Sequence, residues 1–157
     1  MSEIERKWRV SQVLGRVLRG VTPQRLTQAY LVTSPGELRV RTDGTTAWIT
    51  AKSDGSLVRE EWEDEIPLWV FDQLHASTTR RLEKLRYRVE LNERIWEVDV
   101  YQGQLAGLIT VETECASEME ALALSLPDEF GYGEEVTYDH RYKNKCLAVD
   151  GLPSSTS

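Results

Sequence analysis

The chain has 157 residues, a usual length for one domain, and 40% of them are hydrophobic while 29% are charged. This composition excludes a disordered or fibrous protein, and no apolar run approaches the roughly 18 residues of a membrane span. The net charge of −7 argues against a nucleic-acid partner but still allows a small anionic ligand held by a local positive field.

Short runs rich in Val, Ile, Thr, Trp and Tyr predict eight strands. They cover approximately residues 2–10, 26–33, 37–43, 46–52, 57–66, 80–91, 94–101 and 106–114. Turn residues separate several of them, for example Ser34-Pro35-Gly36 and Asp43-Gly44. Links this short favour antiparallel neighbours.

Helical patterns interrupt the strands at residues 11–18, 67–75, 117–126 and 139–149. No internal repeat or second domain is visible, so we expect one domain over residues 1–150 and a disordered tail over 151–157. The charged N-terminus lacks the apolar stretch of a signal peptide, which predicts a cytoplasmic protein. Cys115 and Cys146 lack zinc-site spacing, and we expect both as thiols.

Charged residues recur at every second position of the predicted strands. Glu3, Glu5 and Lys7 therefore share one face of the first strand, because residues i and i+2 point the same way. The same alternation occurs at Arg39 and Arg41, Glu61 and Glu63, Lys84 and Arg86, and Glu112 and Glu114, and Asp99 lies between two valines.

Taken one strand at a time, these charges indicate a half-exposed sheet with its polar face in water. Eight strands together suit a closed antiparallel β-barrel, because closure removes the unprotected edges of an open sheet. We therefore predict an all-β dominated (α+β) fold in which a few helices cover the apolar outside and the charged face lines the lumen. Such a lumen requires a ligand or internal ion pairs, since unpaired buried charge is very costly.

The two signs are balanced within the predicted lumen. Seven residues are positive (Lys7, Arg39, Arg41, Lys52, Arg59, Lys84 and Arg86) and seven are negative (Glu3, Glu5, Glu61, Glu63, Asp99, Glu112 and Glu114). A polyphosphate with bound Mg²⁺ or Mn²⁺ fits this mixture, because cationic groups hold phosphate oxygens and carboxylates hold hard cations. A lattice of salt bridges would balance equally well.

An ordered series of motifs resembles the CYTH domains, or triphosphate tunnel metalloenzymes. Glu3-Ile4-Glu5-Arg6-Lys7 is similar to the ExExK signature of that family. Further similar segments are Gln28-Ala29-Tyr30-Leu31, Arg39-Val40-Arg41, Ile49-Thr50-Ala51-Lys52, Arg59 with Glu61-Trp62-Glu63, Lys84-Leu85-Arg86, Trp96-Glu97-Val98-Asp99, Glu112-Thr113-Glu114 and Arg141-Tyr142-Lys143-Asn144. The resemblance spans approximately residues 3 to 148.

The resemblance implies an eight-stranded tunnel that cleaves inorganic triphosphate to pyrophosphate and phosphate with Mg²⁺ or Mn²⁺. It implies metal ligation by Glu3, Glu5, Glu61, Glu63, Asp99, Glu112 and Glu114, and phosphate binding by Arg39, Arg41, Lys52, Arg59, Lys84, Arg86 and Arg141. Lys7, Glu5 and Tyr30 are the expected catalytic residues, with Lys7 beside the attacking water or the terminal phosphate.

Other functions of such a barrel stay open at this point. They are thiamine or nucleoside triphosphate hydrolysis, the cyclisation performed by class IV adenylyl cyclases, and binding of polyphosphate or nucleotide without turnover. Only Met1 and Ser2 precede the ExExK-like segment, whereas those cyclases have a His-Phe pair there. We expect a small-molecule triphosphate as the partner, with neither nucleic acid nor membrane, and an outer apolar face compatible with a homodimer.

Overall fold

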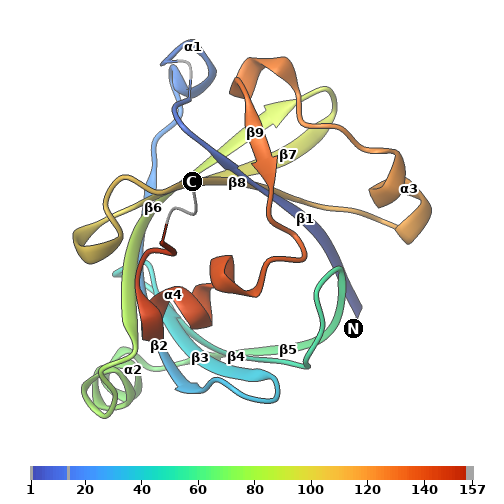
Figure 1. Ribbon diagram of the computed structural model, residues 1–157. Coiled ribbons are helices and arrows are strands. Elements are labelled where there is room, and N and C mark those ends of the chain that lie inside the picture. Colours follow the sequence, from blue (N-terminus) through green and yellow to red (C-terminus); the bar gives the residue numbers. More distant parts are fainter. Residues whose placement is uncertain (1, 14, 155–157) are drawn as a thin grey trace.

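The computed structural model describes residues 2–13 and 15–154 and shows a β-barrel (Figure 1). The strands are β1 (Ser2–Val10), β2 (Gln24–Val32), β3 (Glu37–Thr42), β4 (Ala47–Lys52), β5 (Val58–Ile66), β6 (Arg81–Leu91), β7 (Arg94–Tyr101), β8 (Ile109–Glu114) and β9 (Gly133–Glu135). The helices are α1 (Gly15–Leu18), α2 (Leu68–Ala76), α3 (Glu118–Ala123) and α4 (Asn144–Asp150), with 3₁₀ turns η1 (Gly103–Leu105), η2 (Asp128–Phe130) and η3 (His140–Tyr142).

Eight strands close the barrel in the order β1-β5-β4-β3-β2-β6-β7-β8, and β8 pairs back to β1. All of these pairings are antiparallel. The contact that closes the barrel is short, because β1 pairs with β5 only from Ser2 to Ile4. The expected closed eight-stranded architecture is therefore confirmed, with β9 as an additional strand beside Trp8–Val10 of β1.

Several boundaries differ from those predicted. The last barrel strand begins at Ile109 instead of residue 106, because η1 and the positive φ of Gly107 (101°) precede it. The segment expected as one helix over 139–149 is divided into η3 and α4 by the extended backbone of Lys143. The expected tail begins after α4; its residues 155–157 lie outside the described part, and residues 151–154 form neither helix nor strand.

Apolar residues form two clusters on the outside of the barrel and one that closes its interior. Outside, Trp8, Trp96 and Phe130 form one cluster, and Phe71 of α2 packs in a second cluster with Val40 of β3. Inside, the cluster comprises Tyr30, Leu82, Tyr101, Leu105, Leu108, Val136, Tyr142 and Leu147. Figure 1 shows α4 lying across the ring of strands, and its Leu147 belongs to this inner cluster.

Among the described residues, no helix is both long enough and apolar enough to cross a membrane. The two cysteines, Cys115 and Cys146, are free.

Candidate active site

The barrel holds a cavity of about 220 Å³ whose described lining is mostly charged. Val136 and Tyr142 are its two apolar or aromatic members, and Ser56, Thr137 and Asn144 are neutral polar residues. Seven lining residues are cationic (Lys7, Arg39, Arg41, Lys52, Arg59, Arg86 and Lys143) and eight are carboxylates (Glu3, Glu5, Glu37, Glu61, Glu63, Glu97, Glu112 and Glu114). Strand alternation produces this lining, as the sequence pattern indicated.

The charges are unevenly distributed around the cavity. The arginines and lysines of β3 and β4 lie on one side, whereas β7, β8 and β1 contribute mainly carboxylates. The register places Glu5 of β1 directly opposite Glu114 of β8, and Glu97 of β7 directly opposite Glu112 of β8. Like charges in directly opposed positions destabilise a sheet. Arg86 offsets one pair, because it lies 3.1 Å from both Glu97 and Glu112, and Arg59 lies 3.5 Å from Glu5. The requirement for positive charge is therefore greatest at Glu114, which forms no ion pair with a described residue.

Titration behaviour reflects that requirement. Burial is the largest influence raising the pKa of Glu3, and its contact with Glu61 adds to it, although Lys52 opposes the shift. Desolvation also raises the pKa of Glu114, followed by the negative charges of Glu3, Glu5 and Glu97. A cation bound at these carboxylates would remove the repulsion and lower both pKa values.

The carboxylates fit a divalent metal shared with a phosphate ligand. Oxygen donors of this kind suit Mg²⁺ and Mn²⁺. Within the described chain, no group of three or more His, Cys, Asp or Glu side chains is close enough to hold a metal ion unaided. Mg²⁺ is usually bound by one or two carboxylates together with substrate phosphates, which matches this dispersed arrangement.

On the opposite wall, Arg41 is a partly buried cation whose surroundings indicate an anionic ligand. Its Nε is buried without a hydrogen-bond partner among the described atoms, and its guanidinium lies 5.8 Å from the Trp48 ring centroid. Burial, followed by the neighbouring charges of Arg39 and Arg86, lowers the pKa of Arg41 to about 10. Phosphate oxygens would supply the missing hydrogen bonds and charge.

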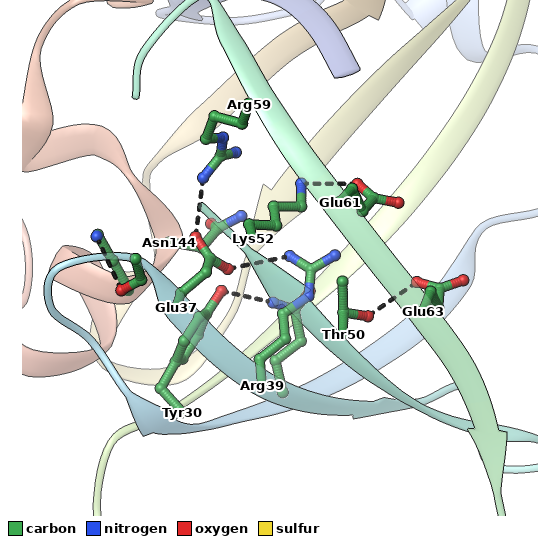
Figure 2. A network of polar contacts seen from close by, with 12 residues as sticks. Tyr30, Glu37, Arg39, Thr50, Lys52, Arg59, Glu61, Glu63 and Asn144 are labelled. Carbon is green, nitrogen blue, oxygen red and sulfur yellow. Dashed lines mark hydrogen bonds and ion pairs between the residues drawn. The ribbon is translucent and has the colours of Figure 1, made fainter. Parts of the chain in front are cut away.

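Other cations of the cavity already have carboxylate partners. Lys52 Nζ lies 2.8 Å from Glu3 Oε1 and 3.4 Å from Glu61 Oε2. Arg59 donates to Glu37 Oε1 at 2.9 Å, and Arg39 lies 3.9 Å from Glu37 Oε2 (Figure 2). Burial opposes ionisation of Glu37, but Arg39, Lys52 and Arg59 together lower its pKa. Glu37 thus occupies the middle of the cationic wall.

Lys7 reaches the cavity from β1. Its Nζ donates a hydrogen bond to the backbone carbonyl of Tyr142 at 2.7 Å, and its strand neighbour on β8 is Glu112. The ammonium group is therefore held by the segment that covers the cavity, next to the carboxylate wall.

Four of the residues expected in the site do not line the cavity. Tyr30 is fully buried, and its hydroxyl accepts a hydrogen bond from Gln28 at 3.0 Å. Lys84 and Asp99, each 1% exposed, form an ion pair of 2.8 Å that Arg86 joins through Asp99. Arg141 pairs with Asp139 at 2.7 Å, and its side chain is 52% exposed.

Conversely, several residues that line the cavity were not predicted from the sequence. Glu37 precedes Arg39 by two positions and Glu97 precedes Asp99 by two, so strand alternation carried a signal for both. Arg141 was the cation expected from its segment, yet its neighbour Lys143 is the one that lines the cavity. Thr137 and Asn144 lie outside the eight barrel strands, and periodicity gives no signal for them.

The closed barrel and its charged lumen define a tunnel-fold protein. A family model described as the CYTH domain matches residues 1–139, and the chain belongs to this family.

Individual relatives agree with this assignment. The chain is 44% identical over 153 residues to the inorganic triphosphatase of Nitrosomonas europaea, covering 95% of this chain and 98% of that protein. It is 31% identical over 150 residues to the inorganic triphosphatase of Acetivibrio thermocellus, covering 92% of each. The crystal structure of the inorganic triphosphatase NE1496 matches with a TM-score of 0.69 and 40% identity over 97% of each chain. A putative adenylyl cyclase from Hippeastrum shares the fold, with a TM-score of 0.61 and 16% identity over 76% of this chain and 82% of that one.

Proposed function

We propose that this protein hydrolyses inorganic triphosphate to pyrophosphate and phosphate, with Mg²⁺ or Mn²⁺ as the cofactor. The observation that carries the proposal is the pair of oppositely charged walls that face one another across a single cavity. Cationic side chains suit the phosphate oxygens, and carboxylates suit the metal. The names of the two curated relatives support the same reaction.

The lining favours an inorganic substrate over a nucleotide. Val136 and Tyr142 are the only described lining residues with substantial apolar surface, whereas sites for organic ligands are usually lined mainly by apolar and aromatic side chains. A base or thiazole ring would have little to pack against beside the phosphates. We therefore expect ATP and thiamine triphosphate to be poorer substrates.

In the proposed reaction the cationic wall binds and orients the substrate. Arg41 and Arg39 can each present a planar pair of N–H donors to phosphate oxygens, and Lys52, Arg59 and Arg86 add further positive charge. Lys7, held by the Tyr142 carbonyl, is placed to contact the attacking water or the charge that develops on the terminal phosphate. Holding the reacting groups in line supplies much of the catalysis of phosphoryl transfer.

Glu3, Glu5, Glu112 and Glu114 are the residues proposed to hold the metal, with Glu61 and Glu63 on the neighbouring strand β5. A bound divalent ion would neutralise developing negative charge and polarise a water molecule. Asp99, Lys84 and Tyr30 are assigned supporting roles beneath the cavity, because none of them lines it.

Phosphate release from inorganic triphosphate, ATP and thiamine triphosphate tests the proposal. Each substrate is assayed with Mg²⁺, with Mn²⁺ and with excess EDTA. We expect the fastest turnover with inorganic triphosphate and loss of turnover in EDTA. Equal turnover in EDTA would refute metal dependence, and binding of triphosphate without phosphate release would leave a binding protein.

A further inference from the structure

Asn144 is a neutral amide within the charged cavity. It is the first residue of α4, and it lines the cavity together with its neighbours Tyr142 and Lys143. Figure 2 draws it with the polar network of Glu37, Lys52 and Arg59. Its Oδ1 accepts a hydrogen bond of 2.5 Å from the hydroxyl of Tyr101, which lies 43 positions earlier in the chain.

Tyr101 fixes which end of the amide faces the cavity. Its side chain is 1% exposed and belongs to the apolar cluster that closes the barrel interior. The hydroxyl of Tyr101 donates to Oδ1, which leaves the Asn144 Nδ2 group for the cavity.

The Nδ2 group has no acceptor among the residues that the structure describes. The cavity already holds eight carboxylates and seven cations, so a neutral donor adds a hydrogen bond without changing the balance of charge. It also places no positive charge near the carboxylates proposed to hold the metal.

We propose that Asn144 Nδ2 donates a hydrogen bond to a phosphate oxygen of the substrate and that Tyr101 is the positioning residue that orients this amide. The inference rests on the proposed function and deepens it by adding a neutral phosphate donor from outside the barrel strands.

Three variants separate this role from a structural one. Asn144→Ala removes the donor, Asn144→Asp keeps an oxygen for Tyr101 but replaces the donor with negative charge, and Tyr101→Phe removes only the hydroxyl. Tyr138→Phe is the matched control, because Tyr138 is 61% exposed and does not line the cavity. Equilibrium binding of inorganic triphosphate is measured by calorimetry in EDTA and with Ca²⁺, alongside KM, kcat and thermal unfolding.

We expect Asn144→Ala to weaken triphosphate binding about tenfold, the usual loss for a hydrogen bond to a charged group. Asn144→Asp should bind more weakly still, and Tyr101→Phe should lose several-fold affinity. The double variant Tyr101→Phe, Asn144→Ala should bind no more weakly than Asn144→Ala alone, because both changes remove the same interaction. KM should rise more than kcat falls, and Tyr138→Phe should match the wild type.

Two results would overturn the inference. One is wild-type affinity in folded Asn144→Ala or Asn144→Asp protein. The other is additive losses for Tyr101→Phe and Asn144→Ala. A wild-type protein that binds triphosphate but releases no phosphate refutes the proposed hydrolysis alone, since the affinities of the variants still decide the role of Asn144. A wild type that binds triphosphate in neither condition refutes both.

Discussion

Glu5 and Glu114 face each other directly across the β1–β8 pairing, although both are carboxylates. Opposed like charges cost stability, and such pairs usually persist where function requires them. The arrangement predicts a measurable conflict between the stability of the metal-free protein and its activity.

Glu114→Gln tests that conflict. Desolvation and then Glu3, Glu5 and Glu97 raise the pKa of Glu114, so its ionised form is less favourable in the folded than in the unfolded chain. In EDTA at neutral pH the variant should be more stable than the wild type, by about 0.2–1 kcal/mol. The difference should shrink as the pH falls and disappear below the ordinary glutamate pKa of about 4.3, where the group is protonated in both states.

The same variant should require more Mg²⁺ for half-maximal phosphate release. Urea unfolding against pH and a metal titration of activity are the two measurements. An unchanged metal requirement would remove Glu114 from the proposed ligands.

Arg41 should show the corresponding behaviour on the cationic wall. Arg41→Lys keeps the charge but loses the planar fork, and Arg41→Ala removes both. We expect Arg41→Ala to weaken triphosphate binding by about 1.5–3 kcal/mol, the scale of a charge-assisted hydrogen bond, and Arg41→Lys by less. Titration calorimetry gives both values. If lysine and alanine lose affinity equally, bidentate geometry is the important property; no loss in either would contradict phosphate binding.

Lys7→Ala should instead reduce turnover more than affinity. The Lys7 ammonium is held 2.7 Å from the Tyr142 carbonyl, beside the carboxylates proposed to hold the metal. A group that contacts the water or the developing charge contributes mainly in the transition state. Steady-state kinetics of Lys7→Ala and Arg41→Ala give the kcat and KM values to be compared. Equal rises in KM with kcat preserved in both variants would make Lys7 one more phosphate-binding residue.

Asp99→Asn should lower the free energy of unfolding more than it changes the metal requirement of the reaction. Removing one member of a buried ion-pair group typically costs about 3–5 kcal/mol, because Lys84 and Arg86 would lose their shared partner. Burial opposes ionisation of Asp99, but Arg86 and Lys84 lower its pKa, so the difference from the wild type should persist above about pH 4 and close only below it.

Glu134→Gln is the control for Asp99→Asn. Its partner Arg9 lies 2.7 Å away, but the two side chains are 55% and 43% exposed, and surface pairs contribute roughly 0–1 kcal/mol. Denaturant unfolding of both variants distinguishes the two cases. A similar small loss for Asp99→Asn would contradict the structural role.

Arg141→Ala and Lys143→Ala form a matched pair of variants, because the two residues lie close together, Arg141 within η3 and Lys143 between η3 and α4. Arg141 is tied to Asp139 outside the cavity, whereas Lys143 lines it. We expect Lys143→Ala to raise KM for triphosphate several-fold and Arg141→Ala to leave it close to the wild-type value. The reverse order in steady-state kinetics would show that the segment rearranges when substrate binds.

Most of the barrel could be predicted because each strand carries its own alternation of charged and apolar residues. Period-two alternation identified the inward face of β1, β3 and β8, where Glu3, Arg39 and Glu112 all line the cavity. β9 was missed because its three residues, Gly133–Glu135, show no alternation, and it exists through pairing with Trp8–Val10. Tertiary pairing of this kind leaves no periodic signal in a short segment.

Depth within the barrel could not be predicted from alternation. Lys84 and Arg86 share one face, yet Arg86 reaches the cavity while Lys84 is buried against Asp99. Alternation predicts whether a side chain faces the inside or the outside of the barrel. An inward side chain reaches the cavity only if it lies above the inner apolar cluster along the barrel axis. The contribution of Asn144 likewise depends on the long-range contact with Tyr101.

The short β1–β5 pairing has a consequence for how this protein behaves at high concentration. Beyond that pairing, residues 61–66 of β5 have β4 on one side and no other described strand on the other. An open strand edge is a template for adding a strand from a second molecule, which leads to aggregation. Four of these six residues are acidic (Glu61, Glu63, Asp64 and Glu65). The same edge of a second molecule carries the same negative charges, so the two edges would repel each other. Acidic side chains on this edge therefore oppose edge-to-edge aggregation, and two of them, Glu61 and Glu63, also line the cavity.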